Sequence, residues 1–288
     1  MKKFNLVDTL FSHEKSIVAG KIPTYFEWNN LLQGNDRVDG PVFYSHEQML
    51  NSITTSYDNS FGLLFESQLI IPGIYHKIRT VENKFKYIFT YNRFLIDKDP
   101  NKFKFIPAQG IWIGGHKGGG SIDIKSKIKN ISMIASEKTM TPMQSFRCKV
   151  AKMMKEKDIV TVFGKSVDNP IVGVSEALDQ YRFSIVIENA AIDNYFTEKL
   201  LNCFAVGTIP IYLGCRNINK FFNMDGIISL NDILPKMSYE NLDNELLEYI
   251  KTLDENSYEV RKDAIQDNFK RCLQYEITED YMYLKYLQ

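Results

Sequence analysis

The chain has 288 residues, of which 44% are hydrophobic and 24% are charged, as in an ordinary globular protein. This length is enough for two domains with substantial buried cores. Lysine plus arginine equals aspartate plus glutamate, at 35 each, and no long basic run is present. The balance of charge therefore argues against a protein that binds nucleic acid.

The cysteines have no CxxC or clustered spacing; they are Cys148, Cys203, Cys215 and Cys272. This pattern indicates free thiols in a reducing compartment and excludes a disulfide framework or a zinc site. The N-terminal residues lack the apolar run of a signal peptide, and no stretch approaches the length of apolar sequence that crosses a bilayer. We therefore expect a cytoplasmic protein with no integral membrane segment. The oligomeric state stays open.

Residues 3–10 and 42–44 are short apolar runs that predict the first strands of an α/β domain. Ser45 follows the second run and has Gln48 three positions later, which is the spacing of a helix capping box. His13 lies in a polar segment, and we interpret it as a solvated loop residue rather than a substrate contact.

Residues 61–71, FGLLFESQLII, place a glutamate inside an apolar run. Because an unpaired buried carboxylate is costly, we expect Glu66 to lie at a strand end and to face a cleft. The alternative is a strand-end glutamate exposed to water. Residues 87–95 predict a further strand and loop, in which Arg93 either meets substrate or faces solvent.

The run Gly114–Gly120 fits neither a Walker loop nor GxGxxG, because the spacing and the following Lys-Ser/Thr are missing. Its composition is that of a flexible linker. We therefore predict a hinge here, between one domain over residues 1–120 and a second domain over residues 121–288. His116 and Lys117 within the run are weak candidates for ligand contact.

In the second half, residues 127–135 and 158–164 predict two strands, and a helix that begins at Ser136 or Thr141 carries Arg147. Residues 242–253 and 258–274 have helical periodicity and predict closing helices.

Residues 183–214 predict one compact βαβ unit. Residues 183–187 alternate with the two-residue period of a buried strand, and residues 208–213 form a second apolar run. Between them Thr197 is a suitable helix N-cap, because its hydroxyl can accept from an amide of the first turn, and Gly207 ends the helix. Such units build open parallel sheets.

Ligands of parallel sheets bind beyond the carboxyl ends of the strands. The polar residues predicted at that edge are Glu188, Asn189, Asp193, Tyr195, Glu198 and Lys199. A helix that begins at Glu198 offers free amides to a phosphate, and Lys199 adds a full charge. A neighbouring carboxylate suits the hydroxyls of a ribose. The segment therefore predicts a nucleotide diphosphate site; a capped helix with solvated charges is the alternative.

The pattern E-N-x5-Y-x-T-E-K-x7-G-T-I-P-I-Y-x-G, from Glu188 to Gly214, resembles the donor-binding signature of the family 10 glycosyltransferases, the α1,3/α1,4-fucosyltransferases. The resemblance continues through residues 221–223 and 227–232. The first half matches only in fragments: Glu66-Ser67, where Gln68 replaces the proline of the family's Glu-Ser-Pro element, and residues 89–91, Phe-Thr-Tyr.

This resemblance implies a GT-B-like α/β fold of two Rossmann-like domains facing across a cleft. It implies an inverting transfer from a nucleotide sugar, GDP-fucose above others, to a glycan acceptor, with no metal and no cofactor beyond that donor. The roles carried over are Glu66 as general base, Arg147 and Lys199 on the leaving diphosphate, Glu198 on the ribose, and Asn189 and Tyr195 on the sugar and phosphates.

Two alternatives keep this site but change the function. The chain is then a transferase for another nucleotide sugar, or a catalytically silent relative that binds a nucleotide or carbohydrate. A dinucleotide enzyme is disfavoured because GxGxxG is absent. The acceptor and the linkage formed are left open.

Overall fold

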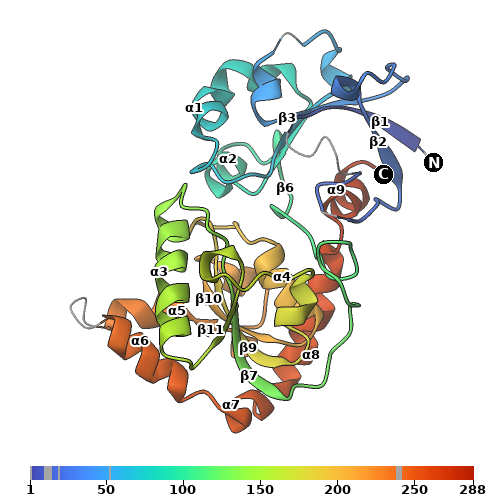
Figure 1. Cartoon of the computed structure of the whole chain (residues 1–288). Coiled ribbons are helices and arrows are strands. Elements are labelled where there is room, and N and C mark those ends of the chain that lie inside the picture. The colour runs from blue at the N-terminus through green and yellow to red at the C-terminus, as the bar shows by residue number, and fades with distance from the viewer. Residues whose placement is uncertain (1, 10–14, 19, 52, 238–241) are drawn as a thin grey trace. The chain divides into compact units, whose positions relative to one another are not determined.

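The computed structural model describes residues 2–9, 15–18, 20–51, 53–237 and 242–288, so His13 lies outside the described residues. The chain forms two compact units (Figure 1). The first consists of Met1–Gly110 together with Tyr275–Gln288, and the second of Ile111–Gln274. Among the described residues, no helix is both long enough and apolar enough to cross a bilayer.

The first unit is built on a sheet with the order β2-β1-β3-β4-β5-β6, in which the neighbouring strands that the structure describes are parallel. The strands are β1 (Lys2–Val7), β2 (Phe26–Asn30), β3 (Val42–Ser45), β4 (Ser60–Leu64), β5 (Tyr87–Thr90) and β6 (Phe103–Phe105). The helices are α1 (Pro72–Val81), α2 (Arg93–Lys98) and α9 (Thr278–Tyr286). Apolar residues of α1 pack in one core cluster with β3 and β5, and Met282 of α9 packs in another with β1 and β2.

The second unit has a parallel sheet with the order β11-β10-β9-β7-β8. Its strands are β7 (Lys129–Ile134), β8 (Thr161–Phe163), β9 (Tyr181–Ile187), β10 (Ile209–Leu213) and β11 (Ile228–Ser229). Its helices are α3 (Pro142–Glu156), α4 (Glu198–Ala205), α5 (Leu230–Ile233), α6 (Leu242–Lys251), α7 (Glu255–Glu259) and α8 (Lys262–Cys272).

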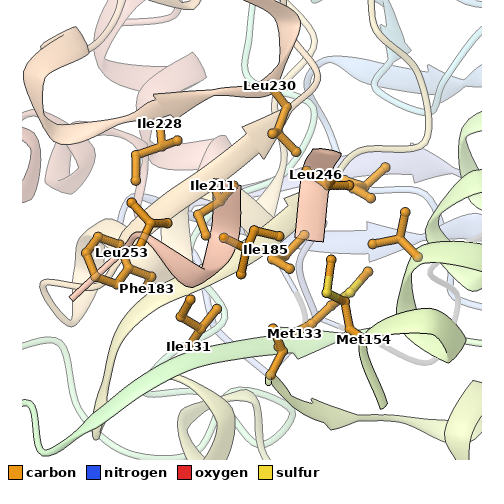
Figure 2. Close-up of a cluster of buried hydrophobic side chains, with 14 of the residues drawn as sticks. Ile131, Met133, Met154, Phe183, Ile185, Ile211, Ile228, Leu230, Leu246 and Leu253 are labelled. Atoms are coloured by element: carbon orange, nitrogen blue, oxygen red, sulfur yellow. The ribbon is translucent and has the colours of Figure 1, made fainter. Parts of the chain in front are cut away.

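Figure 2 shows the main core of the second unit, where strand residues such as Ile131, Phe183 and Ile211 meet Met154 of α3 and Leu246 of α6. Burying one apolar side chain of this size stabilises the folded state by about 1.5–3 kcal/mol.

The first five strands of each unit follow the same spatial order. In each, the first strand in sequence lies between the second and the third, so the winding direction reverses beside it. The reversal falls between β1 and β3 in the first unit and between β7 and β9 in the second. Open α/β sheets bind ligands beyond the carboxyl ends of the strands at such a switch point. The topology therefore predicts that ligands bind at the loops after these four strands.

The predicted βαβ unit is confirmed as β9, α4 and β10. Thr197 caps α4 and accepts a hydrogen bond from the amide of Lys199, and Gly207 ends the helix with φ of 73°. Of the two predicted starts of α3, the structure has Thr141, which forms a full capping box with Gln144. The predicted cap at Ser45 is wrong. Its hydroxyl donates to the Asp8 carboxylate, because Asp8 directly follows β1 and Ser45 ends the neighbouring strand β3 at the switch point.

The glycine run is a compact loop of the second unit and not the flexible hinge that its composition predicts. Backbone bonds close it on itself, from Gly119 to Gly115 at 2.8 Å and from Gly114 to Gly119 at 2.9 Å. The amide of Ser175 ties it to the segment before β9 through the carbonyl of Gly118, also at 2.8 Å. A Cβ at Gly118 would lie 1.8 Å from the carbonyl oxygen of Trp112. These glycines therefore allow close backbone packing, and they place the exposed His116 and Lys117 on a fixed loop.

The observed units also differ from domains over residues 1–120 and 121–288. The chain divides between Gly110 and Ile111, and the last segment packs with the first unit. Helix α9 places Met282 in the core beneath β1 and β2, and its tyrosines pack against the same cluster. Helical periodicity reveals such an apolar face, but it does not say which core the face covers.

Candidate functional site

Arg147 occupies the switch point of the second sheet. Helix α3 starts at its capping box and carries the arginine under the ends of β7 and β9. Nη1 donates to the carbonyl oxygen of Ile187 at 2.9 Å and to Oδ1 of Asn189 at 3.3 Å. Nη2 donates to the hydroxyl of Ser136, just beyond β7, at 3.4 Å. The guanidinium thus joins the loops that follow both strands.

Most of this guanidinium is buried, with 4% of the residue exposed. Burial lowers the pKa of Arg147, against the attraction of the carboxylate of Glu188. An arginine in a protein nevertheless remains charged. Its Nε finds no hydrogen-bond partner among the described residues. Because a guanidinium has five N–H donors, the three bonds above leave it able to bind an anion as well.

Glu188 is the fully buried residue that organises the start of α4. Its carboxylate accepts from the backbone amide of Thr197 at 2.9 Å and from the hydroxyl of Thr197 at 2.7 Å. Burial raises the pKa of Glu188, while the nearby ammonium of Lys199, 3.9 Å away, opposes that rise. Two hydrogen bonds and a cation compensate a carboxylate that would otherwise be very costly to bury.

Lys199 lies in the first turn of α4 between two carboxylates. Its Nζ is 2.7 Å from Oε1 of Glu198 and 3.3 Å from the hydroxyl of Thr197. Burial lowers the pKa of Lys199, but the attraction of Glu198 and Glu188 more than offsets it, so the pKa ends above its ordinary value. The raised pKa keeps the ammonium charged at neutral pH, and 28% of the side chain is exposed.

Asn189 and Tyr195 complete the second-unit group. Asn189 accepts from Arg147 and also from the side-chain amide of Gln144 at 3.3 Å, and its carbonyl oxygen accepts from the hydroxyl of Thr141 at 2.8 Å. Tyr195 is 1% exposed and acts electrostatically on Arg147. The structure therefore brings Arg147, Asn189, Tyr195, Glu198 and Lys199 together, as the sequence predicts. A cationic centre with free donors beyond the ends of parallel strands can bind phosphate oxygens.

Glu66, the predicted base, follows β4 in the first unit. Its Oε1 accepts from the amide of Ser67 at 2.7 Å, and its carbonyl oxygen accepts from the hydroxyl of Tyr75 at 2.8 Å. Its own amide donates to Nε2 of His46 at 3.1 Å. Burial lowers the pKa of His46 to about 3, so the imidazole is neutral and Nε2 is an acceptor. The side chain of Glu66 is half-buried at the strand end, as its position in the sequence predicts.

The sequence alone does not reveal the roles of two residues, Glu188 and His46. Glu188 stands among the polar residues after β9, but only the geometry shows that it anchors the helix cap. His46 has no motif at all. Its φ of 49° and its 2% exposure, which mark it as a constrained position, are visible only in the fold. Among the described residues, no group of three or more His, Cys, Asp or Glu side chains is placed to hold a metal ion.

Residues 124–263 match the family model for glycosyltransferase family 10 (fucosyltransferase), C-terminal part. This segment therefore resembles the C-terminal part of the family 10 fucosyltransferases. The match runs from just before β7 into α8 and contains Arg147, Asn189, Tyr195, Glu198 and Lys199. The resemblance read from the sequence is thereby confirmed.

Curated relatives match this chain over a shorter stretch than the family model does. The chain is 36% identical over 87 residues to GDP-fucose protein O-fucosyltransferase 3 of Danio rerio, which covers 30% of this chain and 17% of that protein. It is 35% identical over 79 residues to the α-(1,3)-fucosyltransferase FucT of Helicobacter pylori, which covers 27% of this chain and 15% of that protein. The matches thus span less than a fifth of the length of either relative.

The fold has solved counterparts. A crystal structure of an α1,3-fucosyltransferase with GDP-fucose aligns with 95% of this chain and 88% of its own, with a TM-score of 0.53 and 16% identity. A second crystal structure of an α1,3-fucosyltransferase gives a TM-score of 0.52 at 17% identity. This likeness concerns the fold, and it confirms the predicted α/β architecture of the GT-B type.

Proposed function

We propose that this chain is an inverting glycosyltransferase that moves L-fucose from GDP-fucose to a hydroxyl group of a glycan acceptor. The family 10 match and the names of the relatives support fucose transfer. The observation that carries the proposal is the network at the switch point, where Glu188 and Thr197 hold Lys199 beside the buried guanidinium of Arg147.

In this proposal the second unit binds the donor. Arg147 and Lys199 face the diphosphate and stabilise the negative charge that develops as it leaves. Their positions are fixed before the reaction by the strand-end carbonyl of Ile187 and by the cap at Thr197, so little reorganisation is needed. The carboxylate of Glu198 accepts from the ribose hydroxyls, and Asn189 and Tyr195 position the sugar and phosphates.

The first unit supplies the base. Glu66 takes the proton from the acceptor hydroxyl as that oxygen attacks C1 of the fucose, on the face opposite the departing GDP. The loop that presents Glu66 is held by the neutral His46, by Tyr75 and by the hydroxyl of Tyr91, which accepts from the amide of Gln68 at 2.9 Å.

Ligand-dependent thermal unfolding tests the donor site. We expect GDP, and not UDP, dTDP, CMP or ADP, to raise the melting temperature. A ligand at a hundredfold excess over its Kd stabilises the fold by about 2.7 kcal/mol. Lys199→Ala should remove the shift, while Lys152→Ala, an exposed lysine of α3, should keep it. A shift with another nucleotide would replace fucose by a different donor sugar, and no shift with any nucleotide would refute the site.

Glu66→Gln separates catalysis from binding. Loss of a general base should lower transfer from GDP-fucose by a factor of about 10²–10⁴ and leave the GDP-induced shift unchanged. The matched control is Glu47→Gln, an exposed glutamate of the same unit. If the native chain binds GDP but transfers fucose to no acceptor, a catalytically silent binding protein becomes the better description. If Glu66→Gln transfers at the native rate, Glu66 is not the base.

A further inference from the structure

The first unit contains a polar pocket of about 290 Å³ beside the carboxyl ends of β1 and β2. Small-molecule sites occupy roughly 300–1,000 Å³, so its volume is at the lower end of that range. Leu6 and Asn30, which are paired across the two strands, line it together with Trp28. The other lining residues are Lys15, Ile22, Pro23, Glu27 and Gln33.

The indole of Trp28 is held in one orientation. Its ring meets the rings of Phe26 and Phe43 edge to face, with centroids 4.7 and 5.1 Å apart. Its Nε1 donates to Oε1 of Glu279 at 3.1 Å. The ring therefore offers the pocket a fixed apolar surface whose own polar atom is already paired.

Helix α9 and the turn before it also hold the chain neighbours of the lining residues Lys15, Ile22 and Pro23. The carboxylate of Glu279 accepts from the amide of Ile17 at 2.5 Å and from the hydroxyl of Ser16 at 3.0 Å. Asp280 accepts from the amide and the hydroxyl of Thr24 at 2.7 and 2.6 Å, and Glu276 pairs with Lys21 at 2.7 Å. The C-terminal segment thus holds both Trp28 and the neighbours of the other lining residues, which lowers the entropy that binding a ligand would cost.

The lining has the chemistry that recognises a sugar. Aromatic rings pack against the apolar C–H face of a pyranose, and carboxylate and amide side chains exchange hydrogen bonds with its hydroxyl groups. Among the residues that the structure describes, the side chains of Lys15, Glu27 and Gln33 have no hydrogen-bond or ion-pair partner. One cation and one anion lie at the rim, so the pocket favours a neutral ligand over a phosphate.

The pocket and Glu66 lie at the same edge of one sheet. Glu66 follows β4, which is separated from β1 by β3. Neighbouring strands are about 4.8 Å apart, so the pocket lies roughly 10–15 Å across the sheet from the loop of Glu66. One sugar ring does not span this distance, whereas a short oligosaccharide does.

We propose that the Trp28 pocket binds a neutral pyranose of the acceptor glycan, at least one residue away from the sugar that receives fucose. This inference rests on the proposed function. It deepens that function, because the acceptor is then an oligosaccharide rather than a single sugar.

Tryptophan fluorescence tests the pocket without any enzymatic activity. The chain has two tryptophans, Trp28 and Trp112. Nε1 of Trp112 has no hydrogen-bond partner among the described residues, so Trp112→Phe breaks no such bond and leaves Trp28 as the reporter. The probes are methyl β-galactoside, methyl β-glucoside, N-acetylglucosamine, lactose and N-acetyllactosamine. We expect a saturable change with at least one of them in the millimolar range.

Substitutions of the lining decide where the sugar binds. Removing a hydrogen bond to a charged group should weaken binding about tenfold in Glu27→Ala, which equals 1.4 kcal/mol. Gln33→Ala should weaken it less, and Glu47→Ala, away from the pocket, should leave it unchanged. No response to any sugar, a response that survives both lining variants, or a response to inorganic phosphate alone would overturn the proposal. The GDP-induced thermal shift is measured separately, so failure of the donor site and failure of this pocket are distinguishable.

Discussion

Substitution of Glu188 by glutamine tests whether a buried carboxylate holds the N-terminal end of α4 in place. The two carboxylate oxygens accept from the amide and the hydroxyl of Thr197. Glutamine has the same shape, but its amide nitrogen cannot accept, so one of these two donors loses its acceptor. Lys199 also loses one of its two neighbouring carboxylates.

The magnitude follows from the geometry. A hydrogen bond to a charged group contributes about 1.5–3 kcal/mol. At 3.9 Å, the attraction between Glu188 and Lys199 is about 4 kcal/mol with an effective dielectric constant of about 20. The cost of burying the carboxylate, which raises the pKa of Glu188, offsets part of this. We therefore expect Glu188→Gln to lower the free energy of unfolding by about 2–4 kcal/mol.

Urea unfolding at neutral pH measures this loss, and the GDP-induced thermal shift measures its consequence for the site. Because the cap and Lys199 shift together, GDP binding should weaken at least about tenfold, or 1.4 kcal/mol. Glu156→Gln, an exposed glutamate at the end of α3, is the matched control. Native stability together with native GDP affinity in Glu188→Gln would refute the role assigned to this carboxylate.

Two further predictions concern pH and the glycine loop. The pKa of His46 is about 3 in the folded chain and about 6.5 in the unfolded chain. Between these pH values the unfolded chain binds more protons than the folded chain. The free energy of unfolding therefore decreases as the pH falls from about 6.5 to about 3, by up to about 5 kcal/mol. Asparagine tolerates the positive φ of this position and does not titrate. Between about pH 7 and about pH 4, His46→Asn should therefore lose less of its free energy of unfolding, measured in urea, than the native chain loses. An equal loss in both proteins would exclude His46 as the cause. Gly118→Ala should cost about 1–3 kcal/mol by overpacking against the Trp112 carbonyl, whereas Gly73→Ala, with its nearest neighbour at 3.5 Å, should not; a mobile hinge would tolerate both.

The second-unit site could be predicted from the sequence because its signals are local. The strand period, the cap at Thr197 and the stop at Gly207 all lie within one short segment. Parallel topology then places the polar residues after β9 at one edge of the sheet. Arg147 joins them because the helix after β7 begins at the same edge.

The rest depends on contacts between distant segments. Composition predicts flexibility for the run Gly114–Gly120, but the glycines serve close packing against Trp112 and residues 173–175, which no local rule specifies. Ser45 satisfies a capping pattern, yet the neighbouring Asp8 is the acceptor of its hydroxyl. The partners of Trp28 are equally distant, since Glu279 lies at the other end of the chain.

That last pairing fixes an order of events during synthesis. The sheet of the first unit emerges from the ribosome early, but Glu279 and Met282 emerge only after the whole of the second unit. Until then the amide of Ile17 and the indole of Trp28 lack their acceptor, and the aromatic face over Phe4 and Phe26 lacks the helix that covers it. Loop-closure entropy rises only slowly with length, so late docking of α9 costs the finished protein little. The second unit, which is continuous in sequence, is complete before the first, and the first unit is finished only when α9 emerges.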